Sequence, residues 1–144
     1  EHSTALAQAL KAVSEVGELA DAVIKDDKDA LKDAIGNTAV CIVNAAKMIG
    51  ARINLWEVTE LDRNKCEKTC AALCAYHVSD LAKASGLVYW LWAIEDAIER
   101  SFQYLACLAE KNGLEFMDCC EAAWLEIMDR KGKMVAGGAF VKDE

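Results

Sequence analysis

The chain contains no proline, only two histidines, and no apolar run that approaches the length of a membrane span. Without proline nothing forces a break in a helix, and the abundance of alanine favours long helices over sheets. The most apolar stretch, Leu87 to Ile94, ends at Glu95, far short of the roughly 20 residues that cross a bilayer. These absences predict an all-α protein without a membrane segment.

Positive charge is scarce as well. The chain has 16 Lys and Arg residues against 24 Asp and Glu, a net charge of -8. Nucleic-acid polymers and anionic membranes attract positive surfaces, so we expect neither as a partner. Seven cysteines, an odd number, without a signal-peptide pattern predict reduced thiols and a cytoplasmic location. The start at Glu1 without methionine indicates that a segment was trimmed or precedes it.

The length of 144 residues, 54% of them apolar, fits a single domain spanning 1–144. Apolar residues at helical spacing, with capping residues at the ends, predict a bundle of about five helices. We expect the first helix at about 4–25 and the second from the charged turn at 26–29 to Gly50. After an irregular segment at 51–62, we expect three more helices at 63–85, 87–111 and 115–131. A tail with Gly137-Gly138 predicts a short C-terminal arm or hairpin. The very apolar fourth helix predicts a homodimer or higher homo-oligomer.

Two groups of polar residues stand out on the first two helices. Glu15 and Glu18 are three residues apart, so they can face one ligand. Asp33, Asn37 and Asn44 form a polar column on a helix that is otherwise apolar nearly all round. Carboxylate and carbonyl oxygens are ligands that Mg²⁺ prefers. The alternative is structural: a solvated acidic face on one helix and ordinary hydrogen bonds on the other.

Three segments resemble a known family. Residues 14–21 (SEVGELAD), 32–37 (KDAIGN) and 126–134 (EIMDRKGKM) look like the MazG-like branch of the all-α nucleoside triphosphate pyrophosphohydrolases, including short single-domain members encoded by phages. The resemblance implies magnesium-dependent hydrolysis of a nucleoside triphosphate, NTP or dNTP, to monophosphate and pyrophosphate. It also implies a site that a second subunit often completes, in the host cytoplasm if the protein is phage-encoded.

The family pattern is ExxE on one helix and ExxD on the next. Glu15 and Glu18 match the first pair as catalytic and metal-binding residues, with one of them orienting the attacking water. Ala34 and Asn37 occupy the second pair and lack both carboxylates. The expected magnesium ligands are therefore Glu15, Glu18, Asp33 and Asn37, and the reduced negative charge predicts weaker binding. The triphosphate contacts expected at the end of the chain are Arg130, Lys131 and Lys133.

Other interpretations stay open. Cys66, Cys70, Cys74 and His77 share one helix face and could hold zinc, although buried thiols more often serve as small apolar core residues. Trp56, Trp90, Trp92 and Trp124 could stack a base, or belong to the core or a subunit contact. The chain could also be a catalytically inactive nucleotide-binding or helical interaction protein, or Asn37 could be an engineered substitution that traps a substrate.

Overall fold

Helix α1 (Ala5–Lys25) and helix α2 (Lys28–Ile49) form an antiparallel pair. Capping residues in the sequence mark the ends of both helices. The Thr4 hydroxyl accepts a hydrogen bond from the Ala7 amide at 3.1 Å, and the Asp27 carboxylate accepts one from the Ala30 amide at 3.0 Å. Between the helices Asp26 adopts φ 55°, and Gly50 ends α2 with φ 80°. The predicted limits of these two helices are confirmed.

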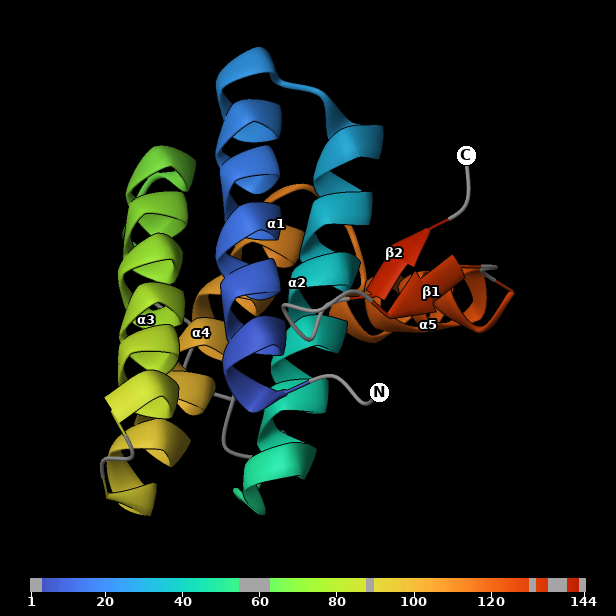
Figure 1. Ribbon diagram of the computed structural model, residues 1–144. Coiled ribbons are helices and arrows are strands. Elements are labelled where there is room, and N and C mark those ends of the chain that lie inside the picture. Colours follow the sequence, from blue (N-terminus) through green and yellow to red (C-terminus); the bar gives the residue numbers. More distant parts are fainter. Residues whose placement is uncertain (1–3, 55–62, 88–89, 130–131, 135–139, 143–144) are drawn as a thin grey trace.

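The computed structural model describes residues 4–54, 63–87, 90–129, 132–134 and 140–142, the last two ranges as backbone. The α1–α2 pair packs against a second pair, α3 (Glu67–Leu87) and α4 (Leu91–Lys111), with α1 lying beside α3 and α2 contacting α4 (Figure 1). The result is a four-helix bundle. Within the described residues no helix has both the length and the apolarity needed to cross a membrane.

Helix α5 (Phe116–Met128) crosses α2 on the outside of the bundle (Figure 1). The crossing is close, because a Cβ atom at Gly36 would clash with the Cys119 carbonyl oxygen and lie 2.8 Å from the Ala123 Cβ. Strands β1 (Gly132–Met134) and β2 (Phe140–Lys142) follow α5 and pair antiparallel. The predicted all-α bundle of five helices with a C-terminal hairpin is confirmed; Gly137-Gly138 lies outside the described residues.

The core is apolar and shared by the helices. Buried side chains come from all of them, with Phe102, Leu19, Ile35, Ile42 and Leu81 among the largest that are fully buried. Helix α2 is buried on several sides, by α1, α4 and α5, as its apolar composition predicted.

Four predicted helix limits were wrong, three of them at the ends of α3 and the start of α4. Helix α3 begins at Glu67 instead of Arg63, because the Arg63 guanidinium pairs with the Glu110 carboxylate at 3.1 Å and the Arg63 carbonyl accepts a hydrogen bond from Lys111. These contacts tie the segment to the end of α4. Helix α3 also continues through Gly86 to Leu87, and α4 begins only at Leu91, after an extended Trp90.

Helix α5 ends at Met128 instead of the predicted Lys131. Strand β1 begins at Gly132, four residues after Met128.

Candidate functional site

The predicted site lies along the α1–α2 pair. Glu15 is ten residues before Lys25, and Asn37 is nine residues after Lys28. At a rise of about 1.5 Å per residue, both lie about 14 Å from the turn that joins the two helices. The fold therefore places the Glu15 turn of α1 and the Asn37 turn of α2 at the same height along two packed antiparallel helices.

Glu15 is a buried carboxylate, with 8% of its surface exposed. Its Oε1 lies 3.7 Å from the Nζ of Lys11, one helical turn earlier. The neighbouring Ala12, Val16 and Leu19 belong to the hydrophobic core. An ionised group among apolar residues is costly unless a cation compensates it, and Lys11 supplies one positive charge here. A bound positive ion beside Glu15 would act in the same sense.

Asn37 is half-buried, and its Oδ1 is buried without a hydrogen-bond partner among the described residues. A buried polar oxygen normally accepts a hydrogen bond, and burying it without one costs free energy. A carbonyl oxygen is a hard donor of the kind that Mg²⁺ accepts. The oxygen of Asn37 and the carboxylate of Glu15 thus fit a hard cation in chemical type.

The other two predicted carboxylate ligands, Glu18 and Asp33, are both exposed to solvent. Ala34, at the position where the family pattern has Glu, is 2% exposed, and its carbonyl accepts a hydrogen bond from the Thr38 hydroxyl at 2.7 Å. The position without its expected carboxylate therefore faces the interior.

No group of three or more His, Cys, Asp or Glu side chains among the described residues could hold a metal ion. Glu15, Glu18 and Asp33 accordingly do not converge as a carboxylate trio within one chain. The predicted triphosphate contacts cannot be compared with the others: Arg130 and Lys131 lie outside the described residues, and Lys133 is described only as backbone of β1.

The row of thiols on α3 is mainly core. Cys70 and Cys74 are fully buried, and burial raises the pKa of Cys74 to about 12. His77 stacks on Tyr104 with ring centroids 5.8 Å apart, and burial, with the nearby Arg100, lowers its pKa. Only Cys66, before the first turn of α3, is exposed. The core interpretation of Cys70 and Cys74 is confirmed.

The described tryptophans lie at the surface instead of the core. Trp90 and Trp92 stack on each other with ring centroids 6.2 Å apart, and are 70% and 66% exposed. Trp124 on α5 is 45% exposed. The possibility that these three are core residues is contradicted, whereas Trp56 lies outside the described residues.

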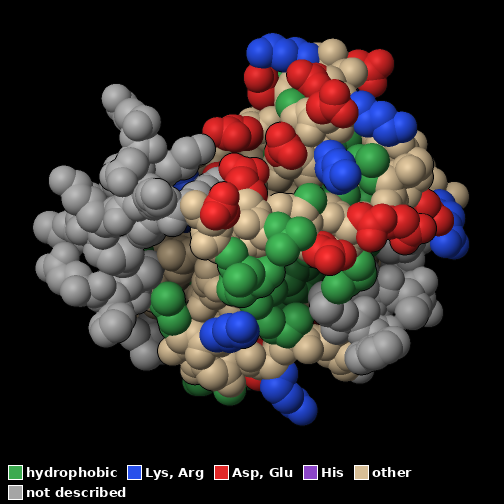
Figure 2. Space-filling model, turned by 90° about the vertical axis from the view of Figure 1, so that its right-hand side faces the viewer, with side chains coloured by type: hydrophobic (Ala, Val, Ile, Leu, Met, Phe, Trp, Pro, Cys, Tyr) green, Lys and Arg blue, Asp and Glu red, His purple; other side chains and the backbone are tan. Residues whose placement is uncertain are grey.

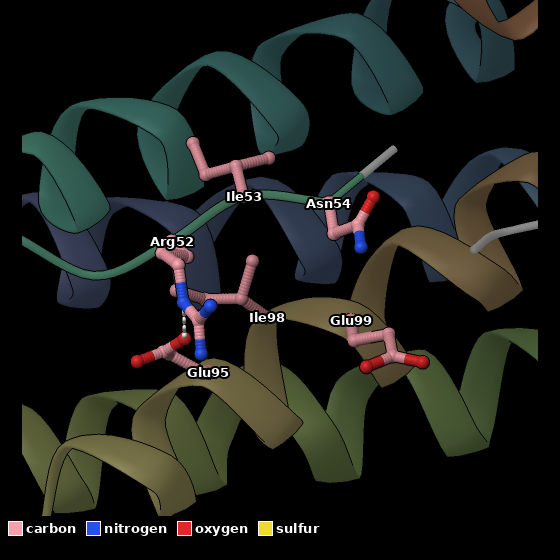
Figure 3. Close-up of a pocket in the computed structure, with 6 residues that line it drawn as sticks. All are labelled: Arg52, Ile53, Asn54, Glu95, Ile98 and Glu99. Carbon is pink, nitrogen blue, oxygen red and sulfur yellow. Dashed lines mark hydrogen bonds and ion pairs between the residues drawn. The ribbon is translucent and has the colours of Figure 1, made fainter. Parts of the chain in front are cut away.

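The structure has two concave surfaces that the sequence did not predict. One, of about 390 Å³, lies between the segment after α2 and the start of α4, where Arg52 and Glu95 form an ion pair at 3.3 Å and Glu99 lies one turn farther on (Figure 3). The other is an apolar groove of about 470 Å³ between α2, α4 and α5. Both are lined by residues that are distant in the sequence, so no local sequence pattern indicated them.

Comparisons with known protein families, with curated proteins and with solved structures find no match to this chain. The functional argument therefore depends on the chain's own residues and on the resemblance of three short segments.

Proposed function

We propose that this protein is a magnesium-dependent nucleoside triphosphate pyrophosphohydrolase with a weakened second acidic motif. The observation that supports it best is the buried, unpartnered Oδ1 of Asn37. By residue count along the two antiparallel helices, Asn37 lies at about the same height as the buried Glu15 on the packed neighbouring helix. Sequence resemblance and burial thus select the same two turns of α1 and α2.

In this proposal Glu15, Glu18, Asp33 and Asn37 would hold Mg²⁺ together with side chains from a second copy, since the carboxylates in the described part of one chain do not converge by themselves. The bound ion would neutralise phosphate charge. Water attacks the α-phosphorus and pyrophosphate leaves. Glu15 or Glu18 accepts a hydrogen bond from that water and orients it in line with the leaving group. Asn37 contributes a neutral oxygen in place of a carboxylate, so affinity for the metal is lower. Arg130, Lys131 and Lys133 bind the triphosphate.

The proposal includes a homodimer in the cytoplasm. A single chain presents no trio of metal-binding side chains among the described residues, so ligands from a second copy would complete the site. All seven cysteines are free thiols, as expected in a reducing compartment where nucleoside triphosphates and magnesium are plentiful.

The test is pyrophosphate release from a panel of ribo- and deoxyribonucleoside triphosphates with Mg²⁺. We expect release that EDTA and Glu18→Ala abolish, and that Asn37→Asp preserves or raises. Asp21→Asn is the matched control, because Asp21 is an exposed acid on the same helix that pairs with Lys25 at 2.7 Å and is not one of the two acids of the ExxE pair. Loss of activity in that control to the extent seen in Glu18→Ala would contradict the assigned roles.

The second candidate is a nucleotide-binding or interaction protein without catalysis. The burial of Ala34 favours it, since the position has neither a carboxylate nor access to solvent. The test compares Asn37→Asp with the double variant Ala34→Glu, Asn37→Asp. If both variants are folded and neither releases pyrophosphate, the result favours this candidate. Nucleotide binding measured by calorimetry on the same samples would then separate a binding protein from an interaction protein.

A further inference from the structure

The apolar groove between α2 and α5 has two walls of complementary character. The α2 wall presents Ala39, Val40 and Val43 and ends at Lys47. The α5 wall presents Met117, Glu121 and Trp124, which share one face of the helix. Phe102 and Phe116 form the floor, with ring centroids 6.0 Å apart.

Helix α5 leaves several large apolar side chains exposed to solvent. Only Cys119 and Ala123 of this helix are buried, whereas Met117 is 57%, Trp124 45%, Leu125 58% and Met128 66% exposed. Figure 2 looks at the side of the molecule where α5 lies in Figure 1, and hydrophobic side chains gather in the centre of this face. Apolar surface concentrated in this way marks an interaction site.

The charges around the groove indicate what covers it. Lys47 lies on one wall and Glu121 on the other, so the groove carries one charge of each sign. In Figure 2 most of the acidic side chains lie above and to the right of the apolar area, with a few basic ones among them, and basic side chains lie below it. A two-fold axis that lies in the plane of this face and runs between the two edges exchanges them, which brings the basic side chains of one copy near the acidic ones of the other.

We propose that this groove is the interface of a two-fold homodimer, in which Lys47 of one copy pairs with the partner's Glu121 and Met117 enters the apolar groove of the other copy. The proposal names the contact surface of the homodimer proposed above, but it does not require catalysis. The molecule as a whole is acidic, so association through most of its other surfaces would be repulsive.

The position of the groove connects the interface to the candidate site. Ala39 and Val40, on its α2 wall, lie within one helical turn of Asn37. At Gly36, the residue before Asn37, α5 crosses α2 so closely that a Cβ atom would clash with the Cys119 carbonyl oxygen. A second copy seated in the groove therefore lies next to the turn that carries the unpartnered oxygen, where side chains from a partner could complete the ligand set.

The test is the dimer dissociation constant, measured by sedimentation without nucleotide or magnesium. We expect Lys47→Glu and Glu121→Lys each to raise it about tenfold or more, because every dimer then contains two pairs of like charges. The double variant should restore it to near the wild-type value. Met117→Asp should leave a monomer with unchanged helical content, since the side chain is exposed in the monomer.

Lys83→Glu and Glu99→Lys are the matched controls: they make the same charge changes at exposed positions outside the groove, and we expect dimers of wild-type strength. A monomeric wild type up to millimolar concentration would overturn the proposal, and so would a dimer that the groove variants do not weaken. Failure of the double variant to recover would refute the Lys47–Glu121 pairing. The wild type could also be monomeric and bind an anionic naphthalene dye, with binding lost in Met117→Asp. That result would assign the groove to a small ligand instead.

These outcomes are independent of the enzymatic test. An inactive dimer that responds to the groove variants as expected would refute only the proposed activity. A fully active monomer would refute only the interface.

Discussion

Asn37 combines two properties that an ordinary surface asparagine does not have. Its Oδ1 is buried, and no donor among the described residues reaches it. The exposed Asp33, one turn earlier on the same helix, has solvent available for its carboxylate. A change of charge at position 37 should therefore affect both folding and metal binding, whereas the same change at position 33 should affect folding little.

Asn37→Asp should destabilise the protein in EDTA by about 1–3 kcal/mol, because an ionised oxygen then occupies the place of the unpartnered carbonyl. Magnesium should raise the melting temperature of the variant more than that of the wild type, since a ligand that binds only the folded state stabilises it. Thermal unfolding followed by circular dichroism, in EDTA and in millimolar magnesium, measures both effects. Asp21→Asn is the control, because Asp21 is exposed and is not among the proposed ligands. Equal melting temperatures for variant and wild type in both buffers would argue against a ligand role for position 37.

The thiols of α3 should differ strongly in reactivity. The Thr69 hydroxyl, 3.2 Å from the sulfur, and the Thr69 amide hold the pKa of the exposed Cys66 below its ordinary value. Burial instead raises the pKa of Cys74 to about 12. Iodoacetamide should alkylate Cys66 first, with a rate that rises with pH and reaches half of its maximum at a lower pH than for an ordinary thiol.

Peptide mass spectrometry of samples quenched over time gives the order of alkylation, and Cys66→Ser should remove the fast phase. Modification of Cys74 at the same rate in native protein would show that α3 opens far more readily than its burial implies.

At the scale of elements, the crossing of α2 and α5 depends on a single glycine. Gly36 allows the Cys119 carbonyl to approach the α2 backbone, where a side chain would clash with it and with Ala123. Glycine in a helix interior costs roughly 0.5–1 kcal/mol relative to alanine. Gly17 on α1 is a useful contrast, because a Cβ there would meet no atom within 4 Å.

Gly36→Ala should lower the free energy of unfolding by about 1–3 kcal/mol, because the added methyl group forces α5 away from α2. Gly17→Ala should raise it by about 0.4–1 kcal/mol, since it removes only the flexibility of the unfolded chain. Urea unfolding of the two variants beside the wild type measures both changes. Stabilisation by both substitutions would mean that α5 is not packed as closely on α2 as described.

At the scale of the whole molecule, the described helices share one core, so they should unfold together. Phe102 joins the parts: it is 2% exposed on α4, packs edge-on against Phe116 in the segment that starts α5, and forms the floor of the groove. Its removal should affect both the bundle and the docking of α5.

Phe102→Ala should cost about 3–5 kcal/mol of unfolding free energy, because it leaves a cavity in the core. Phe102→Leu should cost less, since it keeps most of the volume. Denaturant unfolding followed in parallel by far-ultraviolet circular dichroism and tryptophan fluorescence should give one coincident transition for the wild type. Separate transitions for the two signals would contradict a single cooperative unit.

The sequence by itself determined the helices whose ends carry their own chemistry. Thr4, Asp27 and Gly50 act within one turn of the helix that they cap, so α1 and α2 could be predicted closely. The start of α3 could not be predicted, because Arg63 is held by Glu110, which is distant in sequence. The end of α5 depends likewise on the hairpin that follows it.

Tertiary structure alone decided which of the predicted site residues are buried and which are exposed. The sequence placed Glu15 and Glu18 on one helix, but the packing of the bundle buries the first and leaves the second exposed. The same packing isolates the Asn37 oxygen and creates the groove whose charged residues, Lys47 and Glu121, come from separate helices. Helical periodicity fixes the direction of a side chain around its own axis, whereas burial depends on how the axes pack together, which is a property of the whole fold.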